Sequence, residues 1–172
     1  MEPAELIVNA WLQMKGYFLM TNLRVDRANE KGGKKPEIDI LAIKLKKNKK
    51  EVEEKLHVEI TVAVNPFGKW NKEHIKKNIR KFDEEERKSF IKEYIGENYK
   101  KLLVISDKCI PKNDKEFENI LKKNGIEYIR FSEIIKELKE MMKGKSYDDS
   151  TRRFLGLIFE HESTPCPPQR WA

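Results

Sequence analysis

The sequence predicts an α/β domain in which helices flank a central mixed β-sheet, with elements in the order αβββαβαβα. Two observations support this prediction. In the first half, a helical pattern precedes three strand-like runs with short charged connections, which favours an antiparallel meander. In the second half, strand-like and helix-like runs alternate, which favours parallel pairing through right-handed crossovers. A sheet that contains both halves must be mixed.

The first half supplies one helix and the meander. Pro3 suits a first helical turn, apolar residues recur at helical spacing after it, and Gly16 ends the helix. A polar loop with two glycines and a lysine-rich turn separate the three expected strands. In chain order, these segments are the strand 17–25, the loop 29–35, the strand 37–45, the turn 46–50 and the strand 52–64.

The second half begins with a charged helix after a break at Pro66 and Gly68. Ile75, Ile79 and Phe82 form one apolar stripe at helical spacing, and we expect the helix to continue, with a break, to 96. The final helix is expected to start with Ser132 as its N-cap. The elements between these two helices are a strand over 101–106, a helix over 112–124 and a strand over 126–131.

A chain of 172 residues is long enough for one domain with a well-formed core. We expect this domain to cover residues 1–144, followed by a C-terminal extension and proline-rich tail over 145–172. The apolar cluster within 151–162 is expected to pack onto the domain, and the tail to be loose.

Composition narrows the class of protein. No apolar run approaches the roughly 20 residues that cross a bilayer, and no secretory signal is apparent, so we expect a cytoplasmic protein with Cys109 and Cys166 as reduced thiols. The 36 Lys and Arg residues exceed the 29 Asp and Glu residues, which gives a net charge of +7. Abundant lysine and glutamate are typical of a heat-adapted, solvated surface, whereas the positive excess would attract a polyanion. Composition leaves both interpretations open.

Two carboxylates interrupt otherwise apolar strands. Asp39 lies in the run Ile38–Ile43, where alternation predicts Ile38, Ile40 and Ala42 on one face, and Glu59 is the ionisable residue of the run 58–64. A buried carboxylate needs a cation, a hydrogen-bond network or a shifted pKa. If the two strands pair, the acids can converge, and a divalent cation such as Mg²⁺ would fit ligands that are all oxygen. The alternative is that each acid lies at a strand end in water or beside a loop lysine.

These residues resemble the PD-(D/E)XK nuclease superfamily, which includes restriction endonucleases and archaeal Holliday-junction resolvases. The resemblance covers residues 4–106 and consists of Glu5 on the first helix, Asp39 in EIDILA, and Glu59 with Thr61 in HVEITV. It implies a restriction-endonuclease-like fold and a metal-dependent DNA endonuclease. Asp39 and Glu59 would hold Mg²⁺ or Mn²⁺, and Glu5 would complete or orient the metal shell. A water molecule would then attack a phosphodiester of duplex or branched DNA. Many members cut duplexes as dimers, so a homodimer is also considered, although no interface is identifiable.

The sequence departs from the motif at one position that matters for chemistry. Thr61 stands where the superfamily has a lysine, and a hydroxyl cannot supply positive charge to the reacting phosphate. Lys72, on the flank of the apolar stripe of the charged helix, is our candidate substitute; the alternative is a solvated helix lysine. For Glu5 the alternative is a stabilising interaction with the helix dipole.

Other chemistries receive little support. The glycine loop lacks the spacing of a phosphate-binding loop, and His57, His74 and His161 form no zinc-ligand spacing with the cysteines. Trp70 could stack on a base, but helix anchoring is the commoner role. Two further function classes remain: a catalytically inactive nuclease-like domain that binds nucleic acid, and a protein-interaction module on the same fold.

Overall fold

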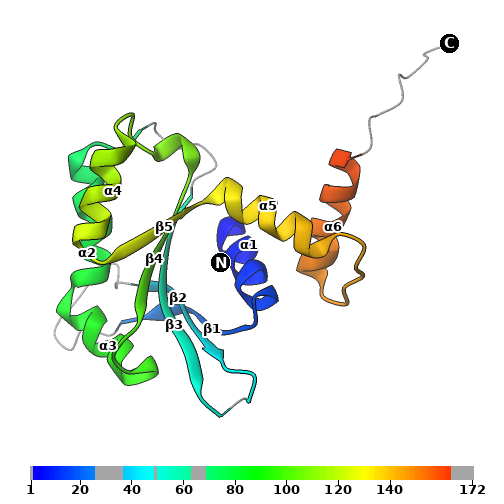
Figure 1. Cartoon of the computed structure of the whole chain (residues 1–172), viewed down its shortest axis with the longest axis horizontal. Coiled ribbons are helices and arrows are strands. Elements are labelled where there is room, and N and C mark those ends of the chain that lie inside the picture. Colours follow the sequence, from blue (N-terminus) through cyan, green and yellow to red (C-terminus); the bar gives the residue numbers. More distant parts are fainter. Residues whose placement is uncertain (1, 26–36, 49, 63–68, 164–172) are drawn as a thin grey trace.

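A five-stranded mixed β-sheet forms the centre of the protein, and helices cover both of its faces (Figure 1). A computed structural model describes residues 2–25, 37–48, 50–62 and 69–163. The predicted class, an α/β domain with a mixed sheet between helices, is therefore confirmed. The glycine loop, the Pro66–Gly68 break and Cys166 lie outside the described residues.

The elements follow the predicted order closely, with one additional helix directly after α2 and another after α5. The strands are β1 (Tyr17–Arg24), β2 (Glu37–Leu45), β3 (Val52–Thr61), β4 (Lys100–Ile105) and β5 (Ile126–Arg130). The helices are α1 (Pro3–Met14), α2 (Lys72–Asp83), α3 (Glu85–Ile95), α4 (Asp114–Lys123), α5 (Phe131–Met142) and α6 (Ser150–Ser163), with a short 3-10 turn, η1, at Asp107–Cys109.

The strands lie in the order in which they occur along the chain. β1, β2 and β3 pair antiparallel as a meander, and β4 and β5 are added in parallel through helical crossovers, so β2 runs against the other four. Short charged turns suffice for the meander, whereas each parallel step needs a longer connection. The predicted mixed pairing is thus confirmed in both halves of the chain.

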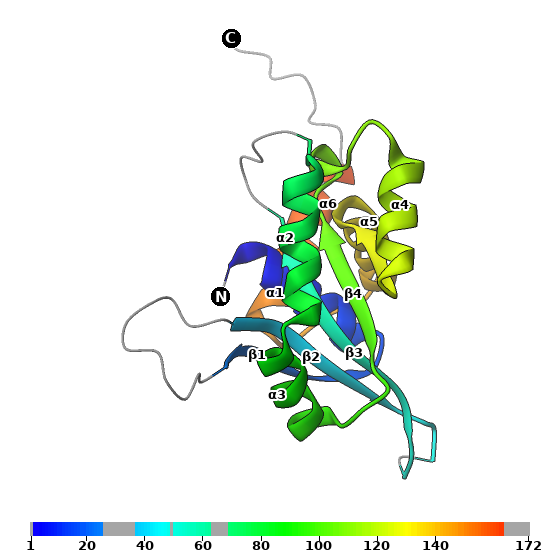
Figure 2. The ribbon, with the colours of Figure 1, turned by 90° about the vertical axis from the view of Figure 1, so that its left-hand side faces the viewer.

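Each face of the sheet has its own core. Side chains such as Val8, Ile40, Val58 and Leu138 join α1, α5 and α6 to one face. On the other face, two further clusters join α2, α3 and α4 to the sheet. Figure 2 shows α2 lying across the strands on this second face, and it is from this helix and from β2 and β3 that the candidate site is built.

Two helix boundaries differ from the prediction for local reasons. Glu84 has extended backbone angles, so the charged helix is divided into α2 and α3. Ser132 is not the N-cap of α5: the helix begins at Phe131, and the Ser132 hydroxyl donates a 2.8 Å hydrogen bond to Asp107 Oδ1 at the end of β4. The hydroxyl of Ser132 therefore ties α5 to η1 instead of capping its own helix.

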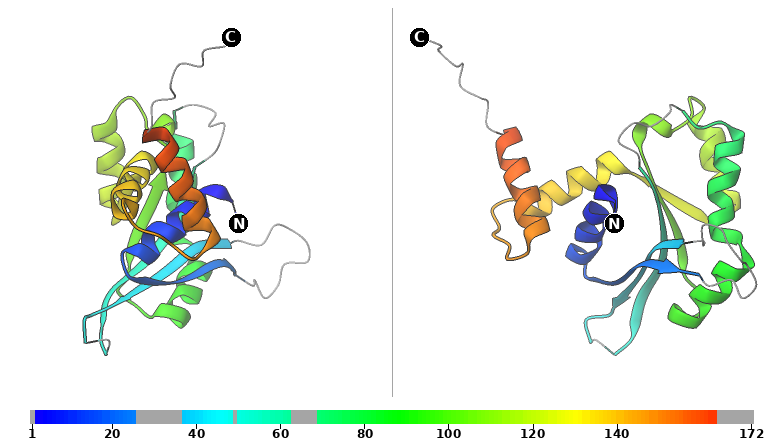
Figure 3. Two further views of the ribbon diagram at one scale, coloured as in Figure 1. Left: turned by 90° about the vertical axis from the view of Figure 1, so that its right-hand side faces the viewer. Right: turned by 180° about the vertical axis from the view of Figure 1, so that it is seen from behind.

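The apolar cluster of the C-terminal extension forms α6, a helix that the sequence analysis did not define. Leu155 and Phe159 are buried in the core shared with α1 and α5, so the expected packing onto the domain is confirmed for these two members of the cluster. Phe154 and Leu157 point to solvent. Figure 3 shows α6 stacked beyond α1 and α5 at the end of the molecule remote from α2. None of the helices in the described part of the chain has the length and apolarity needed to span a bilayer.

Candidate functional site

Asp39 lies where β2 loses regular pairing with both of its neighbours. The pairing of β1 with β2 passes over Asp39 and the opposite residue, Asn22, whose φ is 54°. Asn tolerates this left-handed conformation better than most residues. On the other side, the pairing of β2 with β3 begins at Ile40 and Val58. Asp39 therefore lies at a gap in the backbone hydrogen bonding of the sheet.

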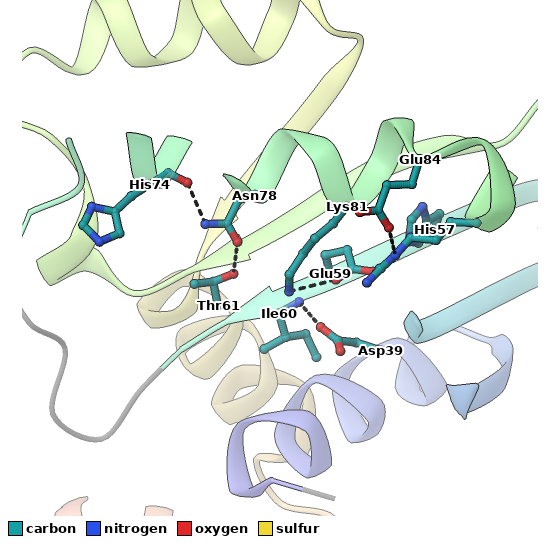
Figure 4. A network of polar contacts seen from close by, with 10 residues as sticks. Asp39, His57, Glu59, Ile60, Thr61, His74, Asn78, Lys81 and Glu84 are labelled. Atoms are coloured by element: carbon teal, nitrogen blue, oxygen red, sulfur yellow. Dashed lines mark hydrogen bonds and ion pairs between the residues drawn. The ribbon is translucent and has the colours of Figure 1, made fainter. Parts of the chain in front are cut away.

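The carboxylate of Asp39 fills part of this gap. The Ile60 backbone N–H donates a 2.7 Å hydrogen bond to Asp39 Oδ2, which places the carboxylate beside the peptide that follows Glu59 (Figure 4). The interruption also disturbs the expected alternation of β2. Ile40 and Ala42 share one face, but Ile38 packs with Leu41 on the other and not with Ile40 as expected.

The ionised form of Asp39 is disfavoured in the folded protein. Burial is the largest cause and the negative charge of Glu59 the next, and together they raise the pKa of Asp39 to about 6. The charge of Lys81 and the Ile60 N–H lower the pKa of Asp39, whereas the charge of Glu5 raises it. The structure therefore brings Glu59 close enough for its charge to act on Asp39, and Lys81 acts on both carboxylates.

Glu59 is fully buried on β3 and is surrounded by basic groups. His57 Nε2 lies 3.0 Å and Arg87 Nη1 2.9 Å from Glu59 Oε1, and Lys81 Nζ lies 3.0 Å from Oε2. Because an ionised carboxylate can only accept, Nε2 of His57 carries the proton of its hydrogen bond. Burial alone would raise the pKa of Glu59, but the His57 hydrogen bond and the charges of Lys81 and Arg87 outweigh it, so this pKa lies below its ordinary value.

The two oxygens of Glu59 have different environments. Oε1 is held from the interior, because Arg87 is itself buried and also donates to Glu84 Oε2 at 3.0 Å, and His57 packs against the rings of Phe82 and Tyr99. Oε2 makes no hydrogen bond within the described residues and has Lys81 as its ionic neighbour. One oxygen of Glu59 is therefore fixed, and the other faces a side chain that is 30% exposed.

Thr61, at the position of the motif lysine, is engaged with α2. Its Oγ1 donates a 3.1 Å hydrogen bond to Asn78 Oδ1, and Asn78 Nδ2 donates to the carbonyl of His74 at 2.9 Å. Asn71 caps the start of this helix through the backbone N–H groups of Glu73 and His74. Thr61 thus faces the same helix that carries Lys81 (Figure 4).

Lys72 does not join this group. Its ammonium lies 3.5 Å from Glu116 of α4, and its side chain is 82% exposed. On a helix of 3.6 residues per turn, Lys72 and Lys81 point in opposite directions, so only one of the two can face Glu59. The structure therefore places the candidate substitute on the wrong side of α2, and Lys81 is the lysine that reaches the carboxylates.

Glu5 lies near the site but has a structural partner. Its Oε2 accepts a 3.0 Å hydrogen bond from the backbone N–H of Glu2, which fixes the start of α1. Its charge still raises the pKa of Asp39, so the three acids named by the resemblance act in one region. Glu5 therefore has a local role at the start of α1, as a member of a capping box, in addition to its electrostatic effect on Asp39.

The donor set of the site fits a hard divalent cation held mainly by two carboxylates. Among the described residues, no three His, Cys, Asp or Glu side chains are grouped to hold a metal ion. Mg²⁺, however, is usually bound through one or two carboxylates, with water and substrate oxygens completing its shell. Glu59 Oε2 is buried without a hydrogen bond beside Lys81, and burial together with the charge of Glu59 disfavours the ionised form of Asp39. Both properties would be relieved by a cation.

The remaining candidates have structural roles. Trp70 is buried against Phe117, with ring centroids 6.3 Å apart, so it anchors α2 and α4 as the commoner interpretation expected. Cys109 is a buried free thiol. His74 is exposed and is bonded to Asn71. None of these three side chains contacts Asp39 or Glu59.

Sequence reasoning missed Lys81, Arg87 and Asn78. Arg87 had a usable signal, since it precedes Ile91 and Ile95 at helical spacing and so occupies a core position of α3. A cation at a core position of a helix and an anion in an apolar strand are expected partners. Lys81 had no comparable signal, because its neighbours on the helix do not reveal which flank of α2 faces the sheet. No protein-family model matches the chain, and no curated protein or solved structure is significantly similar to it.

Proposed function

We propose that this protein is a metal-dependent DNA endonuclease of the PD-(D/E)XK type, with Asp39 and Glu59 as its metal-binding carboxylates. The observation that carries the proposal is the environment of Asp39, which combines burial, a nearby negative charge and an interruption of strand pairing. Burial and the charge of Glu59 keep its pKa near 6, at a point where β2 is paired with neither neighbour. Perturbed titratable groups of this kind cluster at functional sites, although ion-pair networks can also produce them.

The arrangement of elements supports the same proposal. α1 carries Glu5, the antiparallel meander carries Asp39 on its middle strand and Glu59 on its last, and α2 follows directly over the site. This is the order on which the resemblance rests, and the restriction-endonuclease-like identity of the fold is part of the proposal. Fold alone does not define an activity, so the proposal depends on the carboxylates.

In this proposal Asp39 and Glu59 would hold a divalent cation, Mg²⁺ or Mn²⁺. Such an ion, when bound, supplies water activation and neutralises charge on the phosphate. The protein's own contribution is to hold the ligands: the Ile60 N–H orients Asp39, and Arg87 and His57 fix Oε1 of Glu59. Ligands held by such contacts need little reorganisation when the ion binds.

DNA is the proposed substrate because positive charge borders the site. Lys77 is exposed on α2, next to the flank of the helix that carries Lys81, and the whole chain carries a net charge of +7. Lysines and arginines that contact phosphates bind nucleic acid without reading its sequence. Duplex and branched DNA are therefore both candidates.

One specific observation favours a second function, a nuclease-like domain that binds nucleic acid without cutting it. Both oxygens of Glu59 already have basic neighbours, and a cation would have to displace or share the position of Lys81. Thr61 also leaves β3 without the motif lysine. If the ion pairs of Glu59 are too stable to open, the fold would retain binding and lose catalysis.

Cleavage of supercoiled plasmid and of a four-way DNA junction, with Mg²⁺ or Mn²⁺, tests the proposal. We expect the unaltered protein to nick DNA and Asp39→Asn to reduce the rate by at least about 100-fold. Asp148→Asn is the matched control, since Asp148 is fully exposed and remote from the site. Salt-sensitive DNA binding without cleavage would favour the second function. Neither cleavage nor binding would reject both.

A further inference from the structure

Lys81 occupies a position that no motif assigns. It extends from α2 toward β3, and its Nζ lies 3.0 Å from Glu59 Oε2 (Figure 4). Its charge also acts on Asp39, the second carboxylate. The side chain is 30% exposed, so its ammonium can reach both the carboxylates and a ligand that arrives from solvent.

The neighbouring cations are less suited to contact a substrate. Arg87 is 8% exposed and is held between Glu59 and Glu84, so it orients Glu59 but lies too deep to meet a phosphate. Lys72 pairs with Glu116 on the far side of α2. Lys81 combines contact with Glu59 and access to solvent.

The position of the motif lysine faces the same space from the opposite side. Thr61 Oγ1 is bonded to Asn78, three residues before Lys81 on α2. Residues three apart on a helix lie on neighbouring parts of one face, so Thr61 and Lys81 both lie between β3 and α2. A lysine at position 61 of β3 and Lys81 of α2 would therefore direct their ammonium groups into the same region.

We propose, on the basis of the proposed function, that Lys81 supplies from α2 the positive charge that β3 lacks at Thr61, and is a catalytic residue that contacts the scissile phosphate. During hydrolysis the oxygen of a water molecule bonds to phosphorus and loses one proton to solvent. The bridging P–O bond breaks with its electron pair on the leaving oxygen, which takes a proton from solvent. The Lys81 ammonium keeps its protons and stabilises the negative charge that develops on the non-bridging oxygens.

This assignment makes two measurable properties change in opposite directions. Without Lys81, the phosphate loses a charge partner in the transition state, so cleavage slows. The carboxylates of Asp39 and Glu59 lose a competing cation at the same time, so they attract a divalent ion more strongly. A lysine that merely supported the fold would not produce this opposition.

The test compares Lys81→Met with Lys76→Met, a change of equal charge on the exposed far side of α2. We expect Lys81→Met to lower kcat about 100- to 1000-fold with little change in KM, and Lys76→Met to leave kcat unchanged. Binding of Mn²⁺ to the metal-free protein, followed by electron paramagnetic resonance, should become about tenfold tighter in Lys81→Met alone.

A second-site variant tests whether the charge or the side chain matters. Thr61→Lys in the Lys81→Met background should recover at least about a tenth of the lost activity, whereas Thr61→Lys alone should not raise activity. Full cleavage by Lys81→Met overturns the assignment of Lys81. Slow cleavage with unchanged Mn²⁺ affinity and no recovery by Thr61→Lys also overturns it. Absence of cleavage by the unaltered protein would instead overturn the proposed function, and the assignment with it.

Discussion

Replacing Asp39 by asparagine tests whether the charge of this carboxylate stabilises the fold or costs stability. Asparagine has almost the same shape and keeps an oxygen that can accept the Ile60 N–H, but it carries no charge. In the folded protein the charge of Asp39 is unfavourable, because burial and Glu59 raise its pKa to about 6. The change should therefore stabilise the metal-free protein wherever Asp39 is ionised.

The size of this effect follows from the pKa of Asp39. The value rises from 3.8 to about 6, and each unit is worth about 1.4 kcal/mol, so the upper limit is about 3 kcal/mol. Because the folded pKa is the higher one, stability is greatest below pH 3.8 and is lost as pH rises through 6. The loss of stability caused by ionised Asp39 is nearly complete at about pH 8, and about half of it is present at about pH 5.

Urea unfolding at these two pH values, in the presence of EDTA, measures the prediction. Asp39→Asn should raise the free energy of unfolding by up to about 3 kcal/mol at pH 8, and by about 1.4 kcal/mol less at pH 5. The exposed Asp148 provides the control, since Asp148→Asn should show no gain that depends on pH. A loss of stability in Asp39→Asn at pH 8, or an equal effect at both pH values, would refute the reasoning.

Three further predictions concern the buried ion pairs of Glu59, the exposed lysines of α2 and the packing of α6. Arg87→Met should lower the free energy of unfolding by up to about 3–5 kcal/mol, because the buried carboxylate of Glu59 loses its buried arginine partner and keeps only His57 and Lys81. Adding Glu59→Gln should recover much of this loss in the same denaturation assay. Lys77→Glu should weaken DNA binding and reduce the slope of log affinity against log salt concentration by about 1. Fluorescence anisotropy measures both quantities. An equal effect of Lys76→Glu, on the far side of the helix, would contradict the orientation of α2. Leu155→Ala should cost about 2–5 kcal/mol, and a cost near zero would show that α6 does not belong to the core.

The strands and their pairing could be predicted because they depend on local patterns. Apolar runs with charged turns defined the meander, and alternation of strands with helices defined the parallel half. The two central acids could be found for the same reason, since a single ionisable residue in an apolar strand is conspicuous. β2 has the expected bounds, and the other strands differ from expectation by one to three residues, mostly at their C-terminal ends, where fraying and local irregularity decide the end.

The cation of the site could not be found in this way. A helical wheel divides α2 into an apolar stripe and two flanks, and Lys72 and Lys81 occupy different flanks. Which flank faces Glu59 depends on the crossing of α2 over the sheet, which is a property of the tertiary structure. The alternation of β2 failed at Ile38 for a related reason: the pairing of the strand is interrupted at Asp39, and local periodicity contains no information about a missing neighbour.

Binding of Mn²⁺ to the metal-free protein tests most directly whether Asp39 and Glu59 share a cation. Electron paramagnetic resonance of free Mn²⁺ gives the number of ions bound and their affinity. The account predicts one saturable site in each chain, lost in Asp39→Asn and retained in Asp148→Asn. No saturable binding, or equal binding by the unaltered protein and Asp39→Asn, would contradict the account.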